Sequence, residues 1–510
     1  MRQYDAIVIG AGNGGLSAAV QLLNAGKTCL VCERHNLPGG FATSFVRGRF
    51  EFEASLHEFN GIGTPENPGS ARTLFRELGV DDKIEWIQLK DAYHLLSMKE
   101  EYDFTMPFGL EAFAEASEKL IPGGKAHMER LFSLGRQIRS AMDYLSESKG
   151  KPDPKVLMEK YPDYLNCGSY SVKEGLDAMG FPQIIKDNIC AYWCYLGADC
   201  ENLSFLHYIN MFYSYISGGA AIPKHRSHEL SLAFETRIRE LGGDIWYNSE
   251  VTNILTDSAG HVNGVRLKDG TEIASRHVVA NCSPHVVYGQ LMDPAAVPER
   301  ALKLTNARKF AGRGFTIFLG LDRSPDELGI KDHSYFIYDT CDTVRQYKSM
   351  SVFQDNSVQA SVCLNRADPD CSPSGTTILY MTTLFTSDIW STVTEEDYFE
   401  MKNKVAASMI KRFEEATGTS IHDHIEEIAV ATPETYARYC GHPQGTIYGY
   451  ESQYRDGLMP RIMMVEEDHF VPGLRIGGGF GERLLGFPSS YKSGVNEARR
   501  TLRDMEIEGE

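Results

Sequence analysis

YDAIVIGAGNGG, from Tyr4 to Gly15, joins a short apolar run to a turn that contains four glycines. The apolar, β-branched run is typical of a buried parallel strand. A helical pattern follows from Leu16 to Ala25 and ends at Gly26, and a second apolar strand, Thr28 to Cys32, ends at Glu33. This order of strand, glycine turn, helix and strand predicts a Rossmann-type dinucleotide-binding unit in an α/β fold.

Each part of this turn has a physical role in binding a dinucleotide. Gly10 permits the tight turn, Gly12 lets the backbone approach a pyrophosphate, and Gly15 lets the helix pack on the strand. The free N–H groups of a helix N-terminus favour phosphate. Glu33 can accept both ribose hydroxyls of an adenosine, and an acid here disfavours a 2′-phosphate. The expected contacts in this part are Gly10, Gly12, Asn13, Gly14, Gly15, Glu33 and Arg34.

A second glycine pair, Gly39-Gly40, follows in RHNLPGGFATSF and would let the backbone run beside a ligand longer than NAD. VIGAGNGGLSAA and CERHNLPGG resemble the glutathione-reductase-like FAD superfamily, which contains amine oxidases and phytoene desaturases. Relatives commonly carry an Arg soon after the glycine pair, where this chain has Phe41. The resemblance implies non-covalent FAD beside Gly39, Gly40, Phe41, Ala42 and Thr43.

A glycine-rich stretch near the C-terminus, LRIGGGFGERLLGFPSSYKSG, looks like a second nucleotide turn. Only about thirty residues follow its glycines, too few for a second βαβ unit, so we interpret it as the flavin end of the first site. The resemblance implies that Gly478 and Gly479 lie by the pyrophosphate and ribityl chain. It also places the N-terminus of the last helix by the flavin, where N–H groups stabilise negative charge, at Phe487, Pro488, Ser489 and Ser490. Arg483-Leu484-Leu485 replaces the usual Pro-Gly-Gly.

The resemblance also predicts a discontinuous domain organisation. An amphipathic helix and short alternating strands within 226–295 return the chain to the FAD domain, with the backbone of Val251 at the adenine and Asn281 near the flavin. We therefore expect a Rossmann FAD-binding domain made of 1–74, 226–295 and 471–510, with an inserted α+β substrate-binding domain made of 75–225 and 296–470.

The first insertion looks helical, and the second has strand-like runs at 314–322 and 376–384 before a helix from Glu395 to Ala416. Aromatic side chains are dense in the first insertion, where they would either wall an apolar tunnel or fill a helical core. They are Tyr192, Trp193, Tyr195, Phe205, Tyr208, Phe212, Tyr213 and Tyr215.

IEEIAVATPETYARYCGHPQGTIYGYES, from Ile425 to Ser452, resembles the phytoene desaturase, carotenoid isomerase and retinol saturase group. DPDCSPSGTTIL and KNKVAASMIKRFEE share this resemblance, which covers essentially the whole chain. It implies an FAD-dependent oxidoreductase that desaturates or saturates C–C and C=C bonds of a large apolar substrate, such as a carotenoid, retinoid or related lipid. Hydride would pass to or from flavin N5, and NADH, NADPH or another external carrier would exchange electrons with the flavin.

Three alternatives stay open at this point. One is a redox-neutral double-bond isomerase that uses reduced FAD, and another is an enzyme similar to the amine oxidases. The third is a non-catalytic carrier, because Rab GDP-dissociation inhibitors use a related fold to carry prenyl lipids.

Desaturation also needs a base, and saturation an acid, beside the reacting carbon. The sequence candidates are His57, Glu58, His225, His228, Tyr448 and Tyr450. His57 ranks first because it follows the segment that runs from the glycine pair towards the flavin, and Tyr448 and His225 complete the expected catalytic set. His225 belongs to PKHRS, at 223–227, which replaces a Gly-Gly that commonly lies near the flavin in the resembled family. No metal is expected.

Composition limits the partners and the compartment. The formal net charge of −18 argues against a nucleic-acid surface, and the eleven cysteines suggest reduced thiols in the cytoplasm. Cys29 and Cys32 form a CxxC within an apolar run, so we interpret them as buried strand residues. The stretch from Asn202 to Pro223 has no charged side chain, but its polar residues and glycine pair favour a buried chamber wall over a membrane span. The expected partner is an apolar small molecule. Peripheral contact with a membrane stays open, and oligomeric state has no signature in the sequence.

Overall fold

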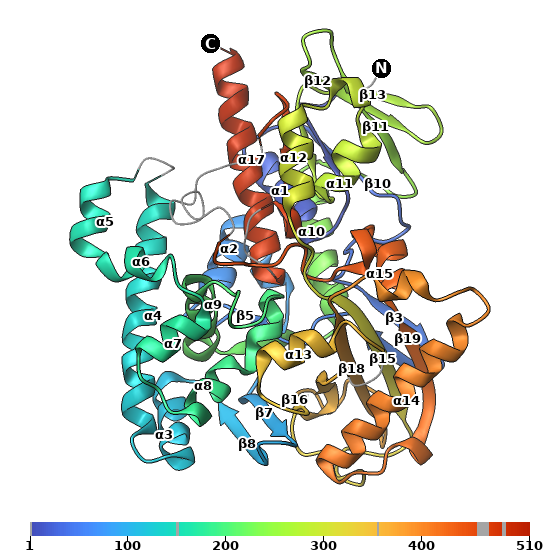
Figure 1. Ribbon diagram of the computed structural model, residues 1–510. Coiled ribbons are helices and arrows are strands. Elements are labelled where there is room, and N and C mark those ends of the chain that lie inside the picture. The colour runs from blue at the N-terminus through green and yellow to red at the C-terminus, as the bar shows by residue number, and fades with distance from the viewer. Residues whose placement is uncertain (1–2, 149–151, 354–355, 456–468, 482–485, 510) are drawn as a thin grey trace.

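The structure is a computed structural model that describes residues 3–148, 152–353, 356–455, 469–481 and 486–509. A parallel sheet next to both chain ends is built from segments that are far apart in the sequence (Figure 1). Its order is β10 (Asp244–Trp246), β2 (Cys29–Cys32), β1 (Ala6–Ile9), β14 (Val278–Ala280) and β20 (Leu474–Ile476). All four neighbouring pairs are parallel, which confirms the Rossmann-type α/β fold expected from the sequence.

Both faces of this sheet are buried. The side chains of β1 point alternately to the two faces, and each face belongs to its own apolar cluster. Ala6 and Val8 pack with α1 (Asn13–Asn24), α10 (Ser227–Glu240) and α17 (Phe487–Gly509). On the other face, Ile7 and Ile9 pack with the antiparallel strands β11 (Val251–Thr256), β12 (Val262–Leu267) and β13 (Glu272–Ala274). A core on each side explains the continuous apolar sequence of β1.

Cys29 and Cys32 are free thiols on β2 that belong to different clusters on the two faces of the sheet. Burial raises the pKa of the Cys32 thiol to about 12 and that of Cys29 further still. The interpretation of this CxxC as buried strand residues is therefore confirmed, and no cluster with metal-ligand composition occurs among the described residues.

A seven-stranded sheet forms most of the second layer of the molecule, below the parallel sheet in Figure 1. Its order is β19 (Ile425–Ala431), β15 (Arg313–Leu321), β18 (Thr377–Phe385), β17 (Val358–Cys363), β16 (Ser334–Tyr338), β7 (Asp91–Ser97) and β8 (Tyr102–Pro107). The helix α14 (Tyr398–Thr417) covers one face and ends at Gly418, which adopts a positive φ of 69°. The first insertion therefore contributes strands as well as helices, which its aromatic, helix-like pattern did not predict.

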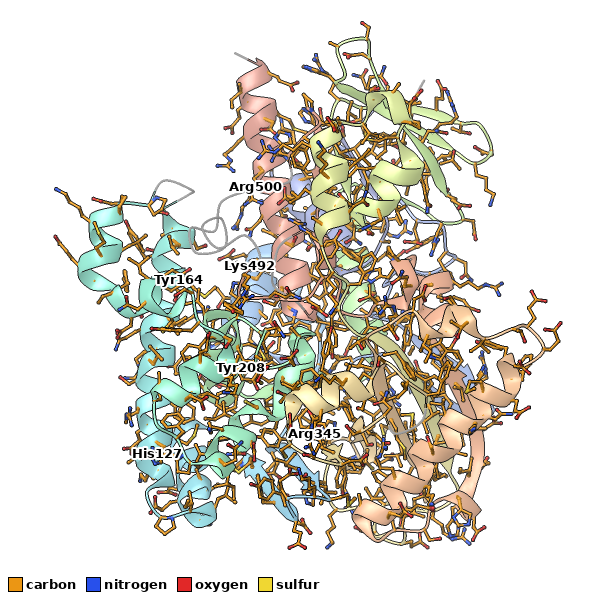
Figure 2. All side chains as sticks on the ribbon, in the orientation of Figure 1. His127, Tyr164, Tyr208, Arg345, Lys492 and Arg500 are labelled. Atoms are coloured by element: carbon orange, nitrogen blue, oxygen red, sulfur yellow. The ribbon has the colours of Figure 1, made fainter. Side chains whose placement is uncertain are left out.

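Helices of the first insertion pack beside this sheet as a separate group (Figure 1), and the side chains Tyr164 and Tyr208 mark them in Figure 2. They include α3 (Leu110–Leu120), α4 (Gly124–Glu147), α5 (Pro154–Lys160), α6 (Pro162–Cys167), α7 (Val172–Ala178), α8 (Gln183–Ile189) and α9 (Phe205–Gly218). The charge-free stretch forms α9 and the buried strand β9 (Ala220–Pro223). Within the described ranges, no helix combines the length and the apolar character needed to cross a membrane.

Two small sheets link the layers. The hairpin of β3 (Ser44–Arg47) and β4 (Phe50–Glu53) packs Phe50 and Phe52 into the core of the second layer. β5 (Phe59–Asn60) and β6 (Trp86–Gln88) both pair with β9. The expected domain boundary after residue 74 falls inside α2 (Ser70–Leu78), because this helix continues packing against α1 and α17 beyond that point.

Candidate active site

One large cavity lies where the carboxyl ends of the parallel strands meet the second layer. Its volume is about 890 Å³, near the upper end of the roughly 300–1,000 Å³ that small-molecule sites occupy. The in-register pairs Ile9–Cys32 and Ile9–Ala280 bring the residues after β1, β2 and β14 to the same edge. Ligands of open α/β sheets bind at this edge, so the fold itself positions the site.

The glycine turn forms one wall of the cavity. Gly12 is the N-cap of α1 and supplies no side-chain hydrogen bond, so the first N–H groups of the helix are available to an anion. A Cβ on Gly15 would lie 1.9 Å from the carbonyl oxygen of Gly10, which explains the close packing of helix on turn. α1 begins at Asn13, before the expected Leu16, because Asn13, Gly14 and Gly15 already have helical backbones.

The C-terminal glycines complete the same wall. A Cβ on Gly14 would lie 2.5 Å from the Cα of Gly478, and a Cβ on Gly478 would lie 2.0 Å from Oδ1 of Asn281. Gly478 also has a positive φ of 79°. The structure thus brings three sequence-predicted residues from three segments into one cradle. Gly477, Gly479 and Asn281 line the cavity there.

Glu33 directly follows β2 and lines the cavity. Its two carboxylate oxygens accept hydrogen bonds from the backbone N–H of Ala11 (2.7 Å) and of His35 (2.8 Å). Each oxygen keeps a second lone pair for a ribose hydroxyl. Val251 also lines the cavity. Arg34 also lines it, but its guanidinium donates to the carbonyls of Arg438 and Tyr439 at the end of α15 (Pro433–Cys440).

The residues expected around the flavin divide into two groups. Phe41 lines the cavity beside Gly39 and Gly40, and its ring stacks on Tyr436 with centroids 5.7 Å apart. Ala42 and Thr43 lie outside the lining, and the Ala42 carbonyl instead accepts a hydrogen bond from Ser231 (2.7 Å). The start of α17 also lines the cavity, with Phe487, Pro488, Ser489 and Ser490. Arg483-Leu484-Leu485 lies outside the described residues.

These features fit a bound FAD. The cradle has no room for side chains at Gly14 or Gly478, and the side-chain oxygen of Asn13 is buried without a partner among the described residues. In a bound FAD, Glu33 would hold the ribose, the start of α1 would hold the pyrophosphate, and the start of α17 would lie at the flavin pyrimidine.

Beyond the cradle, a hydrogen-bonded chain of side chains lies on the second-layer sheet. Thr316 of β15 and Thr382 of β18 are cross-strand partners with hydroxyl oxygens 2.9 Å apart. Tyr436 donates to Thr316 (2.8 Å), and Nε2 of His57 lies 3.3 Å from Oγ1 of Thr382. Burial lowers the pKa of His57 to about 4, so His57 is neutral at pH 7. The four side chains all line the cavity.

Glu58 follows His57, but its partner belongs to the helical insertion and not to the sheet. Its Oε1 accepts a hydrogen bond from the Tyr195 hydroxyl (3.2 Å). Burial raises the pKa of Glu58 to about 8, and the hydrogen bond from Tyr195 limits that rise. The carboxyl therefore keeps its proton at neutral pH.

The remaining catalytic candidates lie in different places. Tyr448 lines the cavity, and burial holds its pKa well above the usual 10. His225 is exposed and lies outside the lining, so the structure does not bring it to the site. The PKHRS segment instead anchors α10, because Arg226 donates to the carbonyls of Glu51 (3.2 Å) and Cys371. His228 and Tyr450 also lie outside the lining.

His442 was not among the sequence candidates, although it lies in the most specific stretch of the resemblance. Nδ1 of His442 donates to the carbonyl of Thr446 (2.9 Å), and its ring contacts Phe41 and Phe480 edge-on. Burial lowers its pKa to about 4. The sequence GHPQGT could have pointed to His442, since the Thr446 carbonyl that orients its ring lies only four residues later.

Most of the dense aromatic set forms a core. Tyr192, Trp193, Tyr208 and Phe212 are fully buried in the main cluster of the second layer, and only Tyr195 and Tyr215 of the set line the cavity. The core interpretation therefore describes most members, while the chamber wall combines these two tyrosines with Met211, Ser214 and Tyr448.

Fold and cradle together define a flavin-binding oxidoreductase. The chain belongs to the flavin-containing amine oxidoreductase family, whose model matches residues 14–401. FAD is the cofactor, and the expected family and enzyme class are confirmed.

Individual proteins add to this comparison. The chain is 24% identical to the all-trans-retinol 13,14-reductase of Homo sapiens, over 92% of this chain and 83% of the relative. It is also 24% identical to the chloroplastic prolycopene isomerase of Daucus carota, over 88% of this chain and 72% of the relative. The solved structure of cyclohexylamine oxidase from Brevibacterium oxydans has the same fold, with a TM-score of 0.62 and 16% identity, over 99% of this chain and 99% of that one.

Proposed function

We propose that the enzyme saturates a C=C bond or desaturates a C–C bond in a large apolar unsaturated substrate, such as a retinoid, carotenoid or related lipid. The observation that carries this proposal is the chamber beyond the glycine cradle, whose wall includes Leu196, Met211, Tyr215 and Tyr448. The names of the retinol reductase and prolycopene isomerase relatives support a polyene as the substrate class.

The chain supplies positioning and exclusion of water. The bound flavin supplies hydride chemistry at its N5 atom. Holding a substrate carbon against that atom in an apolar chamber contributes much of the rate, because the reacting groups are already oriented and dry. The N–H groups at the start of α17 would favour negative charge on a flavin held beside them. The threonine pair on the sheet fixes His57 at the edge of the chamber.

A redox-neutral isomerase is the second candidate, favoured by the prolycopene isomerase relatives, one of which aligns over 99% of this chain. The two activities use the same chamber but differ in electron balance. A saturase consumes two electrons for each product, whereas an isomerase releases a product of unchanged mass.

One anaerobic experiment separates these activities. The purified flavoprotein is reduced with NADH, NADPH or dithionite and mixed with all-trans-retinol or prolycopene. A product that gains two hydrogens while the flavin reoxidises supports saturation, and oxidised enzyme that removes two hydrogens supports desaturation. A geometric isomer formed without reoxidation supports the isomerase. Oxidation of amines with no change in any polyene would contradict both.

We also propose that the enzyme works in the cytoplasm and takes its apolar substrate from a membrane surface by peripheral contact. All eleven cysteines are free thiols, as a reducing compartment requires. Flotation with neutral and anionic lipid vesicles tests the contact, and protein that stays in the soluble fraction with both would contradict it.

A further inference from the structure

Among the residues that the structure describes, Glu58 is the one carboxyl group that lines the cavity and is also buried; the other lining carboxyl groups, Glu33, Glu77, Asp143 and Glu250, are partly or fully exposed. Glu58 is 5% exposed, and its Oε1 accepts the hydrogen bond from the Tyr195 hydroxyl (3.2 Å). The other oxygen, Oε2, is buried and has no partner within the described part of the chain. A buried acid that lines a cavity with one oxygen unpaired is arranged to meet a ligand atom.

The groups around Glu58 are tyrosines from several elements. Tyr195 and Tyr192 lie on the turn Cys190–Leu196, Tyr215 lies on α9, and Tyr448 lies on the loop after α15. When it is ionised, Glu58 also raises the pKa values of Tyr93 on β7 and Tyr380 on β18. Burial is the largest influence on the pKa of the Glu58 carboxyl group, and it favours the neutral acid.

The other cavity residues with shifted pKa values are poor proton donors at pH 7. The histidines have no proton to give because they are neutral, and the tyrosines hold their protons too tightly. His57 and His442 are neutral because burial lowers the pKa of each to about 4. The pKa values of Tyr195, Tyr215 and Tyr448 lie well above 10, so these phenols are weak acids. Among these groups, Glu58 alone, with its pKa raised to about 8, matches the range in which a general acid works best.

We propose that Glu58 is the general acid of this enzyme and donates the proton on Oε2 to one carbon of the substrate double bond. The neighbouring carbon receives a hydride from the reduced cofactor, which an external two-electron donor has reduced. The C=C bond becomes a C–C bond, the cofactor is oxidised, and Glu58 is left as a carboxylate until it takes a proton from water.

This assignment rests on the proposed action on C=C bonds and gives that action a direction. An acid that is protonated at pH 7 favours saturation, and the same group can accept a proton for desaturation only when it is ionised. Saturation is therefore expected to slow as the pH rises through about 8.

The test compares E58Q with the matched control E53Q, using all-trans-retinol as the probe. Gln keeps an acceptor for Tyr195 but cannot supply an acidic proton. Glu53 is a similarly buried carboxyl group, but it lies outside the cavity and binds Ser227 at the start of α10. The flavin spectrum of each variant verifies that the cofactor site is intact. Infrared difference spectra then detect the C=O stretch of a protonated carboxyl group.

We expect E58Q to retain flavin but to reoxidise about 10²–10⁴-fold more slowly with retinol, the range that general acids contribute. Its infrared spectrum loses a carboxylic acid band that wild type and E53Q show at pH 6.5, and in wild type that band fades above pH 8. Two results would overturn the proposal: an unchanged rate and pH profile in E58Q, or no band that depends on Glu58. If wild type converts no polyene, the proposed function fails, and the band alone decides whether Glu58 holds the proton.

Discussion

Gly14 and Gly478 come from opposite ends of the described chain yet pack so closely that a Cβ on the first would lie 2.5 Å from the Cα of the second. The two glycine-rich turns therefore form one cofactor cradle and not two nucleotide sites. Asn281, directly after β14, fills the third side of the contact. This arrangement makes cofactor binding sensitive to very small changes at the C-terminal turn.

Gly478→Ala is expected to abolish or strongly weaken FAD binding, because the new methyl group would lie 2.0 Å from Oδ1 of Asn281. Gly260→Ala is the matched control, since Gly260 has a similar positive φ of 80° but nothing within 4 Å of its Cβ. Flavin absorbance per protein measures the effect. Equal flavin content in the two variants would contradict the shared cradle.

Glu33→Gln is expected to weaken FAD binding by about tenfold, equivalent to roughly 1.4 kcal/mol, because a charge-assisted hydrogen bond to ribose becomes neutral. Gln keeps an oxygen acceptor for the Ala11 N–H but loses the acceptor for the His35 N–H. Titration of the flavin-free protein with FAD gives the dissociation constant. Glu272→Gln, on the hairpin of β12 and β13, serves as the control. Unchanged affinity in Glu33→Gln would place the adenosine elsewhere.

Tyr195→Phe is expected to raise the pKa of Glu58 above about 8, because the hydrogen bond from the Tyr195 hydroxyl lowers this pKa by favouring the carboxylate. The alkaline limb of the rate of flavin reoxidation should therefore move to higher pH. Stopped-flow measurements between pH 6 and 10 would detect the shift. A move to lower pH would show that Tyr195 stabilises the neutral acid instead.

Glu58 should also make folding stability depend on pH. The pKa of its carboxyl group is about 4.5 when exposed to water, as in the unfolded chain, and about 8 in the folded protein, so the folded chain binds more protons between these values. The contribution of Glu58 to stability is then complete below about pH 4.5 and is lost as the pH rises through about 8. Urea unfolding of the flavin-free protein at pH 6 and pH 8 should show a smaller loss in E58Q than in wild type. Equal losses would contradict the raised pKa.

Ser214→Trp is expected to obstruct the chamber from α9 while leaving the glycine cradle untouched, because Ser214 lines the cavity on the helical wall. Flavin content should stay normal, whereas conversion of a long polyene should fall at least about tenfold, the effect of roughly 1.4 kcal/mol of lost binding. Met158→Trp, at an exposed position on α5, is the control for a bulky substitution. Normal conversion by Ser214→Trp would place the substrate elsewhere.

The cofactor half of the site was predictable because its signals are local. Gly10, Gly12 and Glu33 have fixed spacings within one βαβ unit, and that spacing carries the physics of the turn. That the C-terminal glycines belong to the first site followed from the resemblance and from the short length of chain after them, whereas the contact of Gly478 with Gly14 did not.

The substrate half was less predictable because its environment is assembled from distant segments. Nothing near Glu58 in the sequence shows that tyrosines from the first insertion will surround it. The strands β7 and β8 were missed for the same reason, since β7 pairs in parallel with β16 from the second insertion. His225 occupies a segment that the resemblance placed near the flavin, yet Arg226 ties that segment to β4.

The packing of α17 against α1 has a consequence for biosynthesis. α17 is the last helix of the described chain, and it contacts the first helix closely: the Ser17 hydroxyl donates to the carbonyl of Tyr491 (2.8 Å), and a Cβ on Gly494 would lie 1.9 Å from the carbonyl oxygen of Gly14. A growing chain on the ribosome can therefore form the β1–α1 turn early but cannot close the cradle until α17 has emerged. Cofactor loading then follows the synthesis of α17, and bound flavin becomes a marker of polypeptides in which this helix has been made and docked.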